Sequence, residues 1–316
     1  MSRKLSSVFA TAALMSSTAL ADVPNVVVDI APVHSLVARV MQDVGAPDLI
    51  IRSGASPHDY RLRPSEAKAL QDANLVIWMG KELTPWMEDA VKTLSTEAAI
   101  LTLLEKDETT LLEFRESVLF EEHDHDDHSD KEHAETEDQD HDEHAHGAHD
   151  PHAWLSPENA KIWLNLIAAQ LSTADPDNAS TYFVNAAAAM TEIDTLMADV
   201  STMLDPVRGN SFIVFHDAYQ YFETVFEFPA SGAISLGDAT DPSPAHIARV
   251  QGRIQEQKIQ CVLAEPQFKK GLVVTVLEGT DAKTSIIDPL GVALEPGPAL
   301  YPQLIRNMAK TLVDCF

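Results

Sequence analysis

Short β-branched runs alternate with helix-forming stretches in two parts of the 316-residue chain, and this alternation is the strongest constraint on its fold. In the first part, the pattern predicts strands at 25–30, 48–51, 75–79 and 98–103 and helices at 34–44, 64–73 and 85–94. In the second part, it predicts strands at 211–216, 261–265 and 284–288 and helices at 219–226, 243–257, 270–278 and 301–313. Such alternation is typical of βαβ units on a parallel sheet. The sequence therefore predicts an α/β protein with two lobes, each a mostly parallel sheet flanked by helices.

A long stretch without Gly or Pro separates the two parts. It runs from residue 177 to residue 205 and is bracketed by Pro176 and Pro206. A helix of this length would span about 44 Å, well beyond the average helix, which suits a rigid helix that joins two lobes. A further helix is predicted at 157–171, with Ser156 as its N-cap. The predicted domains are an N-terminal lobe at 22–175, a linking helix at 176–207 and a C-terminal lobe at 208–316.

The first 21 residues have the features of a cleavable signal peptide. Arg3 and Lys4 precede a short apolar run at 8–15, and Ala19 and Ala21 place small residues at the −3 and −1 positions of a cleavage site. This apolar run is too short to span a bilayer, and no later run is long enough. We therefore predict cleavage after Ala21 and a periplasmic protein that does not itself span the membrane.

The chain contains two cysteines, Cys261 and Cys315. In an oxidising compartment, an even pair is readily interpreted as one disulfide, which could contribute roughly 4 kcal/mol in the chain-entropy model. Two buried thiols are the alternative. A metal site built on both cysteines is disfavoured because no histidine lies near them at ligand spacing.

Acidic residues outnumber basic ones by 49 to 22, a formal net charge of −27, which argues against nucleic acid as a partner. Almost half of this charge lies at 121–150, which holds 14 acidic residues, one Lys and eight of the 13 histidines. The composition predicts a disordered loop at 121–149. Its histidines are predicted to collect zinc weakly and to release it when they are protonated near pH 6.5. They are His123, His125, His128, His133, His141, His144, His146 and His149.

Five histidines remain outside this insertion: His34, His58, His152, His216 and His246. His58, His216 and Asp288 each lie at or just beyond the end of a predicted strand, and strand ends face the ligand crevice in open α/β sheets. His152 lies in a loop before a capped helix and could join them. Three imidazoles and one carboxylate suit tetrahedral zinc, although each histidine taken alone could equally be structural.

The two other histidines have simpler interpretations. His34 is expected to cap or pack at a helix start. His246 is expected to be exposed at another helix start, where an auxiliary weak zinc site with the insertion is the alternative.

Four sequence segments resemble the metal-ligand motifs of the ZnuA family, the solute-binding proteins of zinc ABC importers. The segment Gly54-Ala55-Ser56-Pro57-His58-Asp59-Tyr60 resembles the first motif and Asp150-Pro151-His152-Ala153-Trp154-Leu155 the second. Phe215-His216-Asp217-Ala218-Tyr219 resembles the third, and Asp288-Pro289-Leu290-Gly291 resembles the aspartate loop. The match runs in order from about Val26 to Phe316 and includes a histidine-rich insertion.

The resemblance implies that two α/β lobes joined by one long rigid helix hold a metal ion in the cleft between them. His58 and His152 would come from the first lobe, and His216 and Asp288 from the second. His216 favours zinc because manganese-binding relatives tend to have glutamate at that position. Pro57 is a departure, since some zinc-binding members have glutamate there. The family also has a cysteine pair similar to Cys261 and Cys315.

The resemblance also implies partners. A monomeric carrier would capture Zn²⁺ in the cleft and deliver it to an inner-membrane permease driven by a cytoplasmic ATPase. Three alternatives stay open: the same fold with manganese or iron as cargo, a zinc hydrolase, and a periplasmic zinc buffer without a transporter. The hydrolase is disfavoured if Asp288 closes the coordination shell, because no position then remains for a nucleophilic water. The chain also lacks a His-Glu-x-x-His pair and a Gly-x-Ser-x-Gly elbow.

Overall fold

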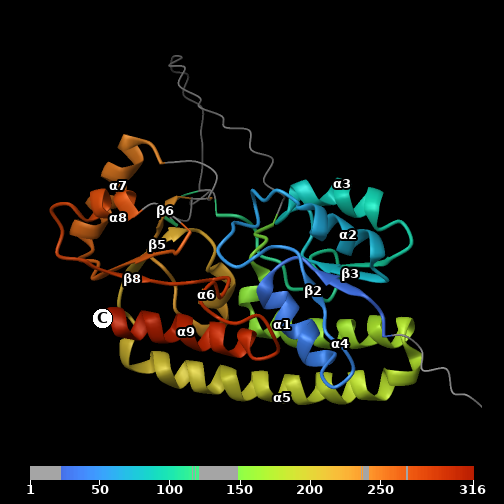
Figure 1. Cartoon of the computed structure of the whole chain (residues 1–316). Coiled ribbons are helices and arrows are strands. Elements are labelled where there is room, and N and C mark those ends of the chain that lie inside the picture. Colours follow the sequence, from blue (N-terminus) through green and yellow to red (C-terminus); the bar gives the residue numbers. More distant parts are fainter. Residues whose placement is uncertain are drawn as a thin grey trace, which may run out of the picture.

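Within the described part of the chain, eight short strands form two separate parallel sheets of four strands each (Figure 1). The first sheet has the order β2-β1-β3-β4, and the second has the order β6-β5-β7-β8. The strands are β1 (Val26–Val28), β2 (Asp48–Leu49), β3 (Leu75–Trp78), β4 (Ala99–Thr102), β5 (Phe212–His216), β6 (Ala233–Ser235), β7 (Cys261–Ala264) and β8 (Lys283–Ile286). The prediction of two α/β lobes with parallel sheets is therefore confirmed.

The computed structural model describes residues 23–115, 117, 119–120, 149–235, 237, 242–267 and 270–316. The predicted signal peptide and its cleavage site after Ala21 lie outside these residues. So does the predicted disordered loop, except for His149. Among the described residues, no helix is long and apolar enough to cross a membrane.

Helices cover both sheets, and one of them runs beneath both lobes (Figure 1). The α-helices are α1 (Ala31–Val40), α2 (Pro64–Asp72), α3 (Pro85–Leu94), α4 (Pro157–Ala174), α5 (Ala179–Leu204), α6 (Gln220–Phe226), α7 (Pro244–Glu256), α8 (Lys270–Leu277) and α9 (Leu300–Cys315). Three short 3-10 helices are η1 (Ala153–Leu155), η2 (Pro176–Asn178) and η3 (Asp205–Val207). Helix α5 is the predicted joining helix; it packs on α1 and α4 of the first lobe and on α9 of the second. The prolines that bracket the stretch lie in η2 and η3, so α5 is slightly shorter than predicted.

Local sequence signals explain most helix starts. Proline lies in the first turn of α2, α3, α4 and α7, where a missing N–H costs no hydrogen bond. The predicted cap of α4 is confirmed, because the backbone N–H of Asn159 donates to Ser156 Oγ at 3.1 Å. Helix α1 begins three residues earlier than predicted, since Pro32 lies within its first turn and not before it. Strand β6 was not predicted, because three residues are too few to show a periodic pattern.

Strand β5 is buried on both faces because alternate side chains point to opposite sides of a sheet. Phe212 and Val214 belong to the large core that extends through both lobes. Ile213 and Phe215 belong to a second, smaller core under α7 and α8. His216 continues the series of Phe212 and Val214, so its side chain lies on the face that meets the first lobe.

The predicted disulfide is confirmed. Cys261 in β7 is bonded to Cys315 at the end of α9, with the two Cα atoms 5.8 Å apart. The bond fixes α9 to the second sheet. At its other end, α9 reaches the first lobe, where the backbone N–H of Tyr301 donates to Ser35 Oγ at 2.9 Å. Helix α9 therefore holds the two lobes together.

Asp29 is a fully buried carboxylate directly after β1. Its Oδ1 accepts the backbone N–H of Ile30 and its Oδ2 accepts that of Met79, both at 2.8 Å. These bonds connect the ends of β1 and β3. Burial raises the pKa of Asp29 to about 7, and the backbone hydrogen bonds lower it by less.

We expect Asp29 to make the stability of the metal-free protein depend on pH. Its folded pKa lies above the unfolded value of about 3.9, so its contribution is fully present below that value and is lost as pH rises through about 7. In Asp29→Asn this titration is removed. The stability of the wild type should therefore fall relative to the variant between about pH 4 and about pH 7, by up to about 1.4 kcal/mol per pH unit, and level off at higher pH. Urea unfolding of both proteins across this range measures the difference, and a difference independent of pH would contradict the expectation.

Candidate metal centre

Three histidines from distant parts of the chain come together between the lobes. His58 lies in the loop after β2, His152 immediately precedes η1, and His216 is the last residue of β5. Each offers a ring nitrogen, and these nitrogens all lie within 4.8 Å of one another. The ring centroids of His152 and His58 are 5.4 Å apart, and those of His152 and His216 are 5.3 Å apart. Ligands of tetrahedral zinc lie about 3.4 Å from one another, so small movements would allow all three rings to bind one ion.

Asp150 holds the ring of His152 in place. The carboxylate oxygen Oδ1 lies 2.6 Å from His152 Nδ1 and also accepts the backbone N–H of His152 at 2.9 Å. Both side chains are buried. A carboxylate at Nδ1 fixes the proton there, so Nε2 is the nitrogen that presents its lone pair to a metal ion.

Burial raises the pKa of Asp150 to about 7. The backbone N–H of His152 and the charge of Arg115 lower it by less. A bound dication would add a further positive charge beside this carboxylate, and positive charge favours the ionised form. Metal binding therefore strengthens the hydrogen bond that orients His152.

Glu265 has the same role for His216. Glu265 Oε1 lies 2.6 Å from His216 Nδ1, and both side chains are buried. Strands β5 and β7 are parallel neighbours, so their carboxyl ends meet at one edge of the sheet. His216 ends β5 and Glu265 directly follows β7. The topology of the second sheet thus creates this pair.

The loop that carries His58 is fixed by contacts with α2 and α3. Trp86 Nε1 donates to the carbonyl oxygen of Pro57 at 2.8 Å, and the Tyr60 hydroxyl donates to Glu66 at 2.9 Å. The rings of Tyr60 and Trp86 are 5.5 Å apart. His58 is half-buried, whereas His152 and His216 are buried. It is therefore the most accessible of the three rings.

Asp288 follows β8 and is not part of the group of three histidines. Its Oδ1 accepts the backbone N–H groups of Leu290 and Gly291, and its Oδ2 accepts that of Val292 at 2.6 Å. The carboxylate thus organises its own loop. Trp154 Nε1, two residues beyond His152, donates to the carbonyl oxygen of the next residue in this loop, at position 289. Asp288 is therefore held near the second histidine through a hydrogen bond between the lobes.

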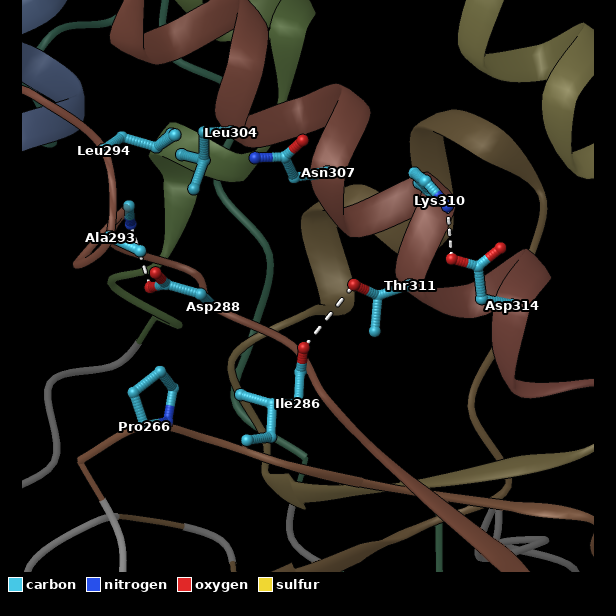
Figure 2. Close-up of a pocket in the computed structure, with 11 residues that line it drawn as sticks. Pro266, Ile286, Asp288, Ala293, Leu294, Leu304, Asn307, Lys310, Thr311 and Asp314 are labelled. Atoms are coloured by element: carbon cyan, nitrogen blue, oxygen red, sulfur yellow. Dashed lines mark hydrogen bonds and ion pairs between the residues drawn. The ribbon is translucent and has the colours of Figure 1, made fainter.

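Asp288 also lines an open pocket of about 320 Å³ between its loop and α9. Figure 2 shows Asp288 beside Ala293, with Asn307, Thr311 and Lys310 of α9 across the pocket. None of the three histidines lines this pocket. Apart from the aspartate loop, the pocket is therefore lined by other residues than the histidine group.

The two remaining histidines outside the insertion do not join the group. His34 is buried in α1, with Nε2 3.0 Å from the carbonyl oxygen of Pro47, and burial lowers its pKa. The expected packing role is confirmed. His246 lies in the first turn of α7, where its backbone N–H donates to Ser243 Oγ at 3.3 Å. Its side chain is half-buried and not exposed as expected, and burial lowers its pKa.

Asp150 and Glu265 were not predicted from the sequence as functional residues. Asp150 could have been found, because a carboxylate two residues before a ligand histidine can reach its Nδ1. Glu265 could have been found only by pairing the predicted strands at 211–216 and 261–265 as neighbours. Carboxylates of this kind orient metal-binding imidazoles and raise their basicity.

The profile of one protein family, described as "Zinc-uptake complex component A periplasmic" (ZnuA), matches residues 26–315. The chain belongs to the ZnuA family. It is similar to the high-affinity zinc uptake system protein ZnuA of Paracoccus denitrificans, with 47% identity over 98% of this chain and 96% of that protein. It is also similar to the protein of the same name from Brucella abortus, with 44% identity over 92% of this chain and 91% of that protein.

Solved ZnuA structures have the same fold. A crystal structure of ZnuA superposes with a TM-score of 0.74 at 20% identity and covers 93% of this chain and 99% of that chain. At this identity, the likeness establishes the fold alone. The fold is therefore that of the ZnuA family. The geometry of the three-histidine group is taken from this chain's own residues.

The carboxylate partner of His216 should be needed for tight metal binding. Replacing Glu265 by Gln keeps the size of the side chain but removes the charge that fixes the imidazole proton and orients the ring. We expect the Glu265→Gln variant to bind Zn²⁺ roughly 10- to 100-fold more weakly than the wild type. Chelator competition measures the affinity, with Glu278→Gln on the exposed surface after α8 as the matched control. Equal affinity of the two variants would show that Glu265 does not support the site.

Proposed function

We propose that the chain captures Zn²⁺ between its lobes and delivers it to the inner-membrane permease of an ABC importer driven by a cytoplasmic ATPase. The observation that carries this proposal is the group of His58, His152 and His216, whose ring nitrogens lie within 4.8 Å of one another. Two of these rings are held at Nδ1 by buried carboxylates. Three neutral imidazole nitrogens are a donor set that zinc prefers over calcium or magnesium. The ZnuA-family relatives are named as zinc uptake proteins.

We propose Asp288 as the fourth ligand. Its Oδ1 accepts two backbone N–H groups, whereas its Oδ2 accepts one and keeps a lone pair for a metal ion. Burial raises the pKa of Tyr219, and the charges of Glu265 and Asp288 raise it further. Asp288 therefore lies within electrostatic range of the residues around His216. One carboxylate and three neutral imidazoles leave a bound Zn²⁺ with a net charge of +1.

Four protein ligands would close the coordination shell. A catalytic zinc site keeps one position open for water, whereas a closed site holds the ion. In this proposal, the chain is not an enzyme, and the ion is cargo. Release to the permease then requires one or more ligands to move away from the ion. His58 is the ligand best placed to move first, because its ring is half-buried whereas those of His152 and His216 are buried.

The histidine-rich insertion and His246 are proposed to collect zinc weakly. Neutral imidazoles interleaved with carboxylates are competent Zn²⁺ ligands near pH 7, and their protonation at lower pH would release the ion. The insertion begins directly after Phe120 and ends beside Asp150, the partner of His152. Ions held there would be released close to the tighter site.

The remaining features complete the proposal. Cleavage after Ala21 would release a monomeric protein into the periplasm, where the disulfide between Cys261 and Cys315 can form. The division into lobes at 22–175 and 208–316, joined by 176–207, remains a prediction.

Removing one ligand histidine should abolish tight binding. We expect His58→Ala and His216→Ala each to weaken Zn²⁺ binding by more than about 100-fold, since each removes a direct ligand. His246→Ala is the matched histidine control and should keep wild-type affinity. Deletion of 121–147 should also keep the tight site. Chelator competition separates the tight site from the weak ones.

Two results would overturn this assignment. Loss of tight binding on deletion of 121–147 would place the site in the insertion. A preference for Mn²⁺ over Zn²⁺ in direct competition would change the cargo, because sites of this donor type ordinarily bind Zn²⁺ more tightly than Mn²⁺.

A further inference from the structure

The chain segments before and after the histidine-rich insertion are bound to each other. Glu113 and His149 form an antiparallel bridge, and the backbone N–H of Asp150 donates to the carbonyl oxygen of Leu112 at 2.8 Å. We call residues 112–115 and 149–150 the neck. The two segments of the neck therefore lie side by side, directly before His152.

The neck is attached to the second lobe through Tyr221 of α6. The Tyr221 hydroxyl accepts the backbone N–H of Leu112 at 3.0 Å and donates to the carbonyl oxygen of Asp150 at 2.8 Å. A single side chain of the second lobe thus binds both segments of the neck. Tyr221 is buried, so these bonds are shielded from water.

Arg115 makes the second attachment. Its Nη1 donates to Asp217 Oδ1 at 3.0 Å, and its Nη2 donates to Glu223 Oε2 at 2.6 Å. The side chains of Asp217 and Glu223 are each 3% exposed, and that of Arg115 is 19% exposed. The ring of Phe120 lies over the guanidinium, 3.9 Å from its carbon atom Cζ. Arg115 is therefore a largely buried cation between two buried carboxylates.

Arg115 is connected to two metal-ligand candidates, to one through Asp217 and to the other through the neck. Asp217 is the neighbour of His216 in the chain. Asp150 belongs to the neck and is bonded to His152 Nδ1. Removing the guanidinium would leave Asp217 and Glu223 as buried charges without their cation, which strongly favours rearrangement. A shift of Asp217 would act on the backbone next to His216, and a shift of Arg115 would act on the neck next to His152.

We propose that Arg115 is a positioning residue for the metal centre, which joins the neck of the insertion to the second lobe and holds His152 and His216 at the distance that one metal ion requires. This inference rests on the proposed function. It assigns the neck a second role, since displacement of Arg115 loosens both histidines together and speeds release of the ion.

The test uses the full-length mature chain with Zn²⁺ and, as a spectroscopic probe, Co²⁺. In Arg115→Gln, we expect Zn²⁺ affinity to fall roughly 10- to 100-fold, mainly through faster release into excess chelator, as for other residues that orient metal ligands. The visible d–d absorption of the Co²⁺ form should change, because the ligand geometry changes. Arg306→Gln is the matched control. It removes an exposed ion pair with Asp199 between α9 and α5 and should leave affinity, release and spectrum unchanged.

A second variant covers the case in which Arg115→Gln does not fold, which thermal unfolding of the metal-free protein detects. Glu223→Gln removes one of the two charges that Arg115 bridges but keeps an oxygen that accepts the backbone N–H of Ala230. We expect release about tenfold faster than in the wild type. Wild-type affinity, release rate and Co²⁺ spectrum in folded Arg115→Gln, or an unchanged release rate in Glu223→Gln, would overturn the inference.

The same assay with His216→Ala separates this inference from the proposed function. If His216→Ala abolishes tight binding and the Arg115 variant does not affect it, only the role of Arg115 is wrong. If His216→Ala leaves tight binding intact, the cleft assignment itself is wrong.

Discussion

The arrangement of the candidate metal centre depends on two buried hydrogen bonds between imidazole and carboxylate, one in each lobe. The pair of His152 with Asp150 comes from the first lobe, and the pair of His216 with Glu265 comes from the second. Each carboxylate fixes a proton on Nδ1 and directs Nε2 toward a common point. Because both pairs are buried, water does not compete for the Nδ1 protons, and the rings are oriented before an ion arrives. This preorganisation reduces the ordering entropy that metal binding would otherwise require.

Orientation of the rings is useful only if the lobes keep a fixed separation, and three elements provide this. Helix α5 packs on helices of both lobes, and α9 is bonded to the second sheet by the disulfide and to α1 through Tyr301. The third element is the neck with Arg115. The first two lie beneath the sheets (Figure 1), whereas the neck lies beside the histidines. The neck is therefore the attachment best placed to influence capture and release.

The sequence predicted the fold well because the signals are local. Alternation of strands and helices, prolines in the first turns and the long stretch before Pro206 each act within a few residues of the element they specify. His58, His152 and His216 were predicted from strand ends and from motifs. The roles of Glu265 and Arg115 could not be predicted in this way. Glu265 reaches His216 because two strands are neighbours in the sheet, and Arg115 reaches Asp217 because the lobes meet there, and neither contact follows from a local sequence pattern. Asp288 was also predicted as a ligand and stays a prediction, but the backbone hydrogen bonds that its carboxylate accepts from its own loop could not be derived from the strand pattern.

We expect one zinc ion to bind three imidazoles through Nε2 while the carboxylates keep Nδ1. A crystal structure of the zinc-loaded protein, with anomalous scattering measured at the zinc edge, would locate the ion and its ligands. One strong peak is expected at about 2.0–2.1 Å from Nε2 of His58, His152 and His216, with Asp288 as the fourth ligand. A peak bonded to Nδ1 of His152 or His216, with Asp150 or Glu265 displaced, or a strong peak only outside this group, would contradict it.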